Sequence, residues 1–396
     1  MSDDIDIKLK RWLLLLTNVI GSRAAGSQQD KQALLVMKNH FEKLGLETTI
    51  ENFIFWAYVP RTWSLSVDNE TIPCLPCVCS KSTDVSPVRG SVVDVGYGSL
   101  DELTDVKGKV ILARIGRVHE SFKAEAAVKK GAIGMLLFSE DDPDGIYTGR
   151  VTYPIGPLPS VCISKNDGLL ISSLSKRRSA KAEITIGADT KRSVGRNLIA
   201  KLPGQATLTD ESIMVTAHRD SRRFSPGAND NGSGCAVMME MARLMVDKQR
   251  KRSIVFFSTD AEEYGCQGSS RFVQRHYPYL TRSCVGALNF DSVGQGKPHL
   301  VGRDREGALS SVLNKYCEIA GKKMGETIGH RDHPGGSDCD SFARTGINAS
   351  WIRCWPSSSF NTTTDSFEKL DYDVMSRICK LGELILDRLA SSSGKI

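Results

Sequence analysis

The spacing of apolar residues changes character along the chain. Near the N-terminus apolar positions recur every three or four residues, which predicts one amphipathic helix running from Leu9 to Ile20 and a second over 28–45. A strand is expected next, at LETTIENF. Between about 63 and 191, short β-rich apolar runs are separated by Gly, Pro and Asp, with one helix at FKAEAAVKKG. The middle of the chain is therefore expected to form a unit of its own.

After about residue 196 the pattern alternates between strands and helices. Strands are predicted at NLIAKL, SIMVTAH, RSIVFFS, VGALNFD and NASWIRCW. Helices are predicted at CAVMMEMARLM, after Gly265 and within 307–320. A last helix carries one apolar stripe, formed by Val374, Ile378, Leu381, Ile385 and Leu389. The alternation predicts an α/β fold, with a mostly parallel mixed sheet sandwiched by helices.

Composition and charge narrow the possible functions. A chain of 396 residues that is 40% hydrophobic can bury the cores of about two domains. The net charge of +6 is small and its basic residues are scattered without interleaved aromatics, so we expect no nucleic-acid partner. Apart from the amphipathic first helix, no apolar stretch approaches the ~20 residues of a membrane span, so no membrane partner is expected. The eleven cysteines are odd in number and dispersed, which favours reduced thiols and a cytoplasmic protein.

Ionisable side chains follow the predicted strands with unusual regularity. SIMVTAH ends at His218, VGALNFD ends at Asp291, and a pair of glutamates follows SIVFFS. Asp220 and Asp230 lie in the loop after His218. Each would usually be a capping or hydrogen-bonding residue if taken alone. Together they belong at the edge where sites form in such sheets, and one histidine among carboxylates suits zinc better than magnesium.

The glutamate pair, Glu262 and Glu263 in TDAEEYG, needs a physical reason. Two adjacent carboxylates at the end of a buried strand repel each other, and burying either is costly. A solvated loop would remove the problem. Alternatively, one glutamate binds a cation and the other works beside it as a base.

Several motifs resemble a known family. TAHRDS, PGANDNGSG, AEEYGCQGSSRF and LNFDSVG occur in the order and spacing of the zinc aminopeptidase family that includes bacterial leucyl aminopeptidases, aminopeptidase Y and glutamate carboxypeptidase II. VKGKVILARIG, FKAEAAVKKGAIGMLLFS and PLPSVCIS resemble a protease-associated (PA) domain, which many members carry as an insertion. The resemblance implies a zinc exopeptidase-like domain formed by 1–62 plus 192–396. The PA domain, 63–191, would cover or shape the substrate cleft, and we expect the peptidase core to fold without it.

The resemblance also implies a metal site. His218 and Asp291 would bind one ion, Glu263 would bind another, and Asp230 would bridge the two. The family places a second-site histidine where this chain has Asn361, in NTTTDSFEKLD. A neutral amide oxygen is a weaker zinc ligand than imidazole, so we expect one tight zinc and a second site that is weak or filled by another divalent ion. His330 and His333 are the alternatives for the missing ligand, although a surface role is the more ordinary interpretation.

The remaining roles concern the reaction. Glu262 would be the general base for the attacking water, and Asp220 would orient the imidazole of His218. The substrate would be a peptide or small amide. Arg222 and Arg223 could pair with a substrate carboxylate, although loop arginines are usually solvated.

Three functions remain open from the sequence. The first is a metal-dependent aminopeptidase or related exopeptidase. The second is a non-catalytic binding relative with a degraded metal site, and the third is an amidohydrolase of N-acyl amino acids. Trp355 and Phe360 flank the departed histidine and could line an apolar pocket or belong to the core. A homo-oligomer is compatible with the sequence.

Overall fold

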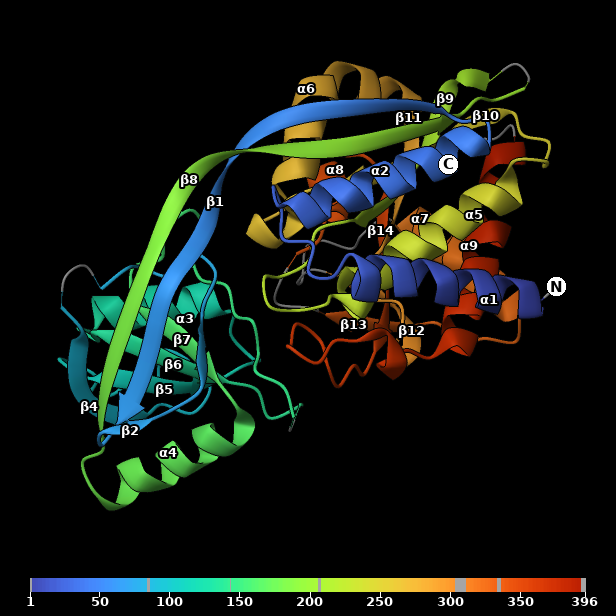
Figure 1. Cartoon of the computed structure of the whole chain (residues 1–396). Helices are drawn as coiled ribbons and strands as arrows, with labels where there is room; N and C mark the ends of the chain where they lie inside the picture. Colours follow the sequence, from blue (N-terminus) through green and yellow to red (C-terminus); the bar gives the residue numbers. More distant parts are fainter. Residues whose placement is uncertain are drawn as a thin grey trace.

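The computed structural model describes residues 2–83, 86–142, 144–205, 208–302, 311–332 and 336–392. Figure 1 shows a larger and a smaller body joined by a long two-stranded ribbon. None of the described helices has the length and apolar character needed to cross a membrane. The N-terminal helices and the C-terminal helix both belong to the larger body.

The larger body is built on a twisted mixed sheet. Its neighbouring strands β9 and β10, β9 and β11, β11 and β14, and β12 and β13 are parallel, whereas β8 and β12 run antiparallel to β10 and β14. In sheet order the strands are β13 (Gly329–Asp332), β12 (Lys297–Gly302), β14 (Ala349–Trp355), β11 (Cys284–Phe290), β9 (Leu208–His218), β10 (Arg252–Thr259) and β8 (Lys181–Leu202). The predicted α/β sheet is confirmed, and the parallel strands bring their carboxyl ends to one edge.

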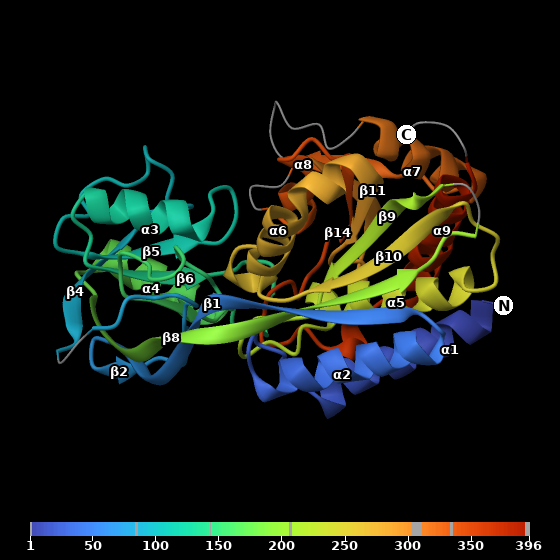
Figure 2. The same ribbon diagram turned by 90° about the horizontal axis from the view of Figure 1, so that it is seen from above.

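Helices cover both faces of this sheet. One face packs against α1 (Ser2–Leu13), α2 (Gln28–Lys43), α5 (Gly234–Met245), α7 (Ser311–Lys323) and α9 (Tyr372–Ser391). The opposite face packs against α6 (Gln267–Ser283) and α8 (Cys339–Ala343). Figure 2 shows the sheet between these layers. The predicted stripes face the core, since Leu9, Leu13 and Leu389 are completely buried.

Local sequence signals account for where several helices start. The side chain of Ser27 accepts a hydrogen bond from the backbone of Asp30 and caps α2, and Asp371 caps α9 in the same way. The first helix continues beyond α1 as a wider turn, η1 (Leu14–Val19). The helix predicted within 307–320 begins in the described part of the chain at Ser311, and residues 303–310 lie outside it.

The ribbon consists of two long antiparallel strands. β1 (Glu47–Val67) pairs with β8 along its whole length, with a register shift at Pro60. The expected strand at LETTIENF is therefore only the first part of a strand of 21 residues. The proposed domain boundaries, 63 and 191, fall inside these strands. The alternation of polar and apolar residues is the same on both sides of the point where each strand passes between the bodies. The pattern therefore did not show that one strand serves both bodies.

The smaller body continues the sheet beyond β8, which pairs with β4 in antiparallel orientation, and has one helix on each face. Strands β4 to β7 are parallel to one another, and the antiparallel strand β3 closes one edge. Helix α3 packs on one face and α4 on the other. The bounds are β2 (Glu70–Thr71), β3 (Cys74–Pro76), β4 (Val88–Asp94), β5 (Val110–Arg114), α3 (Glu120–Lys129), β6 (Gly134–Phe138), β7 (Ser160–Ile163) and α4 (Lys165–Arg177).

The two bodies share part of a hydrophobic core. Phe55 on the ribbon and Tyr264 of the larger body pack in one buried cluster with Ile111, Leu137 and Cys162 of the smaller body. The rings of Phe55 and Tyr264 lie 5.2 Å apart. A loop of the smaller body also pairs with the larger one through an antiparallel bridge. This shared interior argues against the expectation that the larger body folds alone.

Candidate metal centre

Three of the predicted ligands meet at the carboxyl edge of the sheet. His218 ends β9, Asp291 directly follows β11, and Asp230 lies in the turn η2 (Ala228–Ser233) that leads into α5. The Nε2 atom of His218 is 3.0 Å from Asp230 Oδ1 and 3.7 Å from Asp291 Oδ1. All three side chains are buried, and their ligand atoms lie within 4.8 Å of one another.

The chemistry of this group fits a bound zinc ion. Asp230 Oδ1 is buried and has no hydrogen-bond partner among the described residues, although His218 Nε2 is close. A lone carboxylate oxygen that faces a nitrogen without a hydrogen bond is costly unless a cation joins them. Burial lowers the pKa of the His218 imidazole, but the three surrounding aspartates outweigh it and raise that pKa well above its usual range. A cation that binds here displaces a proton and neutralises the same carboxylates.

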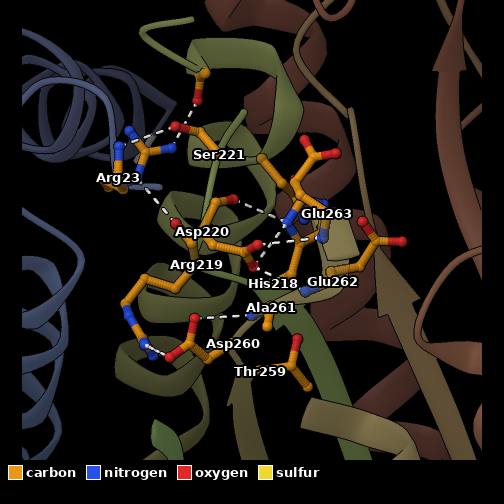
Figure 3. Close-up of polar contacts among 12 residues, drawn as sticks. Arg23, His218, Arg219, Asp220, Ser221, Thr259, Asp260, Ala261, Glu262 and Glu263 are labelled. Atoms are coloured by element: carbon orange, nitrogen blue, oxygen red, sulfur yellow. Dashed lines mark hydrogen bonds and ion pairs between the residues drawn. The ribbon is translucent and has the colours of Figure 1, made fainter. Parts of the chain in front are cut away.

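The loop after β9 orients the imidazole. His218 Nδ1 lies 3.0 Å from the backbone oxygen of Asp220 and 3.7 Å from its carboxylate. A proton on Nδ1 that is donated to this carbonyl leaves Nε2 free to bind a metal. The Asp220 carboxylate itself accepts the backbone N–H groups of Glu262 and Glu263, each at 3.1 Å (Figure 3). One residue therefore fixes both the histidine and the glutamate turn.

Glu262 lies in a tight turn at the mouth of the centre. The turn, η3 (Glu262–Tyr264), is flanked by Ala261 at φ 57° and Gly265 at φ 90°. Glu262 is half-buried, and its Oε1 accepts a hydrogen bond from the Cys266 thiol at 3.4 Å. Burial raises the pKa of Glu262 well above its usual range. Its carboxylate thus has access to the cleft and takes up a proton readily, as a general base requires.

Glu263 is held by Arg222, whose role the sequence left open. Arg222 Nε donates to Glu263 Oε2 at 2.6 Å, and Arg222 Nη1 donates to the backbone oxygen of Thr148 at 2.6 Å. Arg222 is 7% exposed, so it is not the solvated loop residue that its position suggested. Burial raises the pKa of Glu263 to about 7, against the opposing effect of Arg222. The signal was the sequence HRDSRR, in which the second arginine directly follows the metal-binding motif.

No histidine of the described residues takes the place of the one that the family motif has at position 361. Asn361 is buried and has a backbone φ of 56°. Its backbone oxygen accepts hydrogen bonds from the N–H and the hydroxyl of Thr148, both at 2.7 Å. His330 binds Glu318 at 2.8 Å and leaves its side chain 58% exposed. His333 lies outside the described residues. The oxygens near Glu263 therefore make a poorer donor set than the first three ligands.

Other buried charged residues hold the strand ends in place, and the sequence did not indicate their roles. Asp365 accepts the N–H groups of Asn229 and Asp230 at 2.8 and 3.0 Å, which fixes the Asp230 turn. Arg219 pairs with Asp30 at 2.8 Å. It also lies 3.3 Å from Asp260 (Figure 3). Only their places in the motifs could have indicated them, since Asp365 follows NTTT and Asp260 precedes AEE.

A cleft of about 420 Å³ opens over the centre. Both bodies line it, and its size is within the usual range for a small ligand or short peptide. Trp355 and Phe360 line the wall, where the guanidinium of Arg353 lies 4.1 Å from the Phe360 ring. The PA-like body contributes Arg117 and Arg150. The cleft therefore has an acidic floor at the metal centre and arginines around it.

The fold and centre define a metal-dependent peptide hydrolase, and comparison with known proteins agrees. Residues 197–383 match the model of peptidase family M28, and 85–171 match the PA domain. Aminopeptidase YwaD of Bacillus subtilis is 28% identical over 381 residues, which cover 93% of this chain and 81% of the relative. An aminopeptidase of Pseudomonas aeruginosa is 27% identical over 300 residues, covering 69% of this chain and 54% of the relative.

Solved structures share the fold. A zinc aminopeptidase from Bacillus subtilis, BSAP, matches with a TM-score of 0.78 and 24% identity, over 99% of this chain and 96% of the other. A peptidase M28 precursor from Shewanella amazonensis matches with a TM-score of 0.82 and 22% identity, over 100% and 97%. The chain therefore resembles zinc aminopeptidases that carry an inserted PA domain, and these matches support a zinc-dependent metallopeptidase.

Proposed function

We propose that the chain is an aminopeptidase that releases N-terminal residues from peptides with one tightly bound zinc ion. The observation that carries the proposal is the buried group of His218, Asp230 and Asp291 beside the accessible carboxylate of Glu262. The names of the relatives from Bacillus and Pseudomonas supply the aminopeptidase specificity. The centre by itself supports hydrolysis of a peptide or amide bond.

Each residue of the centre has a distinct task. His218 Nε2, Asp230 and Asp291 would hold the zinc. When bound, the ion polarises the substrate carbonyl and lowers the pKa of water. Glu262 would take a proton from the attacking water and deliver it to the leaving nitrogen as the C–N bond breaks. Asp220 acts indirectly, because its hydrogen bonds set the positions of the Glu262 turn and of the imidazole.

A second candidate is hydrolysis of N-acyl amino acids, and one observation favours it. The cleft is lined by four arginines in addition to Arg222: Arg117, Arg150, Arg331 and Arg353. Such a rim suits a substrate with a free carboxylate. A panel of amino-acyl p-nitroanilides and N-acyl amino acids separates the two candidates. A purely binding role is disfavoured, because a binding module has no need for this many buried acids in one pocket.

The cysteines support a cytoplasmic location. Cys77 and Cys162 are both buried with their sulfur atoms 3.4 Å apart, and neither forms a disulfide. Dispersed free thiols are typical of proteins kept in a reducing compartment. Fractionation of the native cells would test this part of the proposal.

The test of the proposed function is Glu262→Gln. The variant keeps the size and the backbone contacts of the turn but cannot take up a proton, so turnover should fall by roughly 10²–10⁴-fold while zinc is retained. Cys266→Ser is the matched control, because it changes the neighbour that donates to Glu262 and leaves the carboxylate in place. Its turnover should stay close to that of the unaltered protein.

Two results would contradict the assignment. Near-normal turnover of Glu262→Gln on the best substrate would remove Glu262 as the base. Zinc-loaded unaltered protein that hydrolyses no member of the panel would instead indicate the non-catalytic relative.

A further inference from the structure

The feature that the family relationship does not explain is the cation beside Glu263. The chain departs from the family motif at Asn361, and the same region contains a buried arginine. Arg222 Nε and Glu263 Oε2 are 2.6 Å apart, the distance of a strong charge-assisted hydrogen bond. We propose that the guanidinium of Arg222 takes the place of a second divalent ion, so that the site holds one exchangeable ion and one cation fixed to the chain.

The guanidinium is fastened at two sides. Besides Glu263, it donates from Nη1 to the backbone oxygen of Thr148, and its centre lies 5.7 Å from the Tyr147 ring. Thr148 and Tyr147 belong to the PA domain, whereas Arg222 and Glu263 belong to the peptidase domain. The PA domain thus holds the arginine in place. Moving a buried arginine that makes these two hydrogen bonds is costly.

The same loop also contacts Asn361, which stands at the position of the missing histidine. Thr148 donates from its N–H and its hydroxyl to the backbone oxygen of Asn361, so one residue fixes both Arg222 and Asn361. The Asn361 side chain makes no hydrogen bond with the described residues and lines the cleft. The arginine beside Glu263 and the amide at 361 are therefore coupled through Thr148.

Charge and ligand number explain why a second ion is excluded. Arg222 compensates the charge of Glu263, which leaves only Oε1 of this carboxylate available. A divalent ion at Oε1 would lie next to a guanidinium, and like charges that close repel strongly in a buried site. Asp230 is then committed to the first ion with His218. Among the described residues, what remains for a second ion is one carboxylate oxygen and a neutral amide, which is a weak donor set.

The proposal rests on the proposed function only in taking His218, Asp230 and Asp291 as the ligands of the single ion. Its test is therefore a count of bound metal, which does not depend on turnover. The purified full chain is loaded with excess Zn²⁺ or Mn²⁺ and dialysed, the bound metal is measured by plasma mass spectrometry, and affinities are measured by competition with a chelator. The unaltered protein should bind one zinc per chain.

Four variants separate Arg222 from Asn361. Asn361→His alone should still bind one zinc, because Arg222 continues to occupy Glu263. Arg222→Met alone should gain only a second zinc-binding step, with an affinity at least about 100-fold lower than that of the first, because the amide of Asn361 remains a poor ligand. Arg222→Met combined with Asn361→His should bind two zincs. Arg223→Met, a neighbour that does not contact Glu263, is the control and should bind one.

The outcomes bear on the proposal in different ways. Two equally tight zincs in the unaltered protein, or in Asn361→His alone, would overturn it. A folded double variant that still binds one zinc would also overturn it. If the Arg222→Met variants fail to fold, Arg222→Lys and Asn361→His decide the matter, and one zinc is expected in both. Loss of turnover with an unchanged zinc count would count against the proposed function and leave the role of Arg222 intact.

Discussion

Arg219 offers a direct test of how the strand ends that carry the site are held together. Its Nε donates to Asp30 of α2 at 2.8 Å, and its Nη2 donates to the backbone oxygen of Arg196 at 3.0 Å and lies 3.3 Å from Asp260. The side chains of Asp30, Arg219 and Asp260 are all 0% exposed. Arg219 directly follows His218, and Asp260 lies two residues before Glu262. The network therefore links the strand ends that carry His218 and Glu262.

The substitution Arg219→Met keeps most of the volume and removes the charge. It leaves Asp30 and Asp260 buried without their cation, and losing one partner of a buried pair costs about 3–5 kcal/mol. Burial already raises the pKa of both carboxyls. Without Arg219 they take up protons more readily in the folded state than in the unfolded one, so the loss should shrink as the pH falls from 7.5 to 5.5. We expect Arg219→Met to lower the free energy of unfolding by about 3 kcal/mol at pH 7.5.

The assay is urea unfolding followed by tryptophan fluorescence at both pH values. The double variant Asp30→Asn with Arg219→Met removes one of the two uncompensated charges, so it should be more stable than Arg219→Met by at least ~1 kcal/mol. A loss below about 1 kcal/mol in the single variant, or no recovery in the double variant, would refute this account. The network would then be a packing feature whose charges contribute little.

Two further predictions concern the PA domain. Replacing residues 64–190 by a short Gly/Ser linker should give an aggregated or partly unfolded core, because Phe55 and Tyr264 lose the cluster they share with the insertion; a monodisperse, zinc-binding core in size-exclusion chromatography would contradict this. Lys123 is buried, which lowers its pKa to about 8, so the free energy of unfolding should rise between pH 8 and 10 as the folded state releases a proton that the unfolded state keeps. Lys123→Met should remove up to ~1.4 kcal/mol per pH unit of that rise, and parallel pH curves for the two proteins would rule it out.

The sequence by itself predicted most of the elements and the residues that meet at the candidate metal centre. Periodicity of 3.6 residues predicted α2, α5 and α9, because an apolar stripe must face a core wherever the helix packs. Parallel strands bring their carboxyl ends to one edge, so the sequence predicts that His218 and Asp291 lie together. Both inferences depend on local pattern and on topology that follows from it. For that reason they could be made from one sequence.

The tertiary structure decided the long-range contacts, which a local sequence pattern does not encode. No periodicity shows that β1 and β8 run on from one body into the other, since a strand keeps its alternation across a domain boundary. The pairing of Arg222 with Glu263 joins residues 41 positions apart, and Thr148 reaches them from the inserted domain. An arginine in a loop is solvated unless a distant segment covers it, and only the folded chain shows which segment does so. The surroundings of Glu263 therefore depend on contacts between domains, which a local sequence pattern does not reveal.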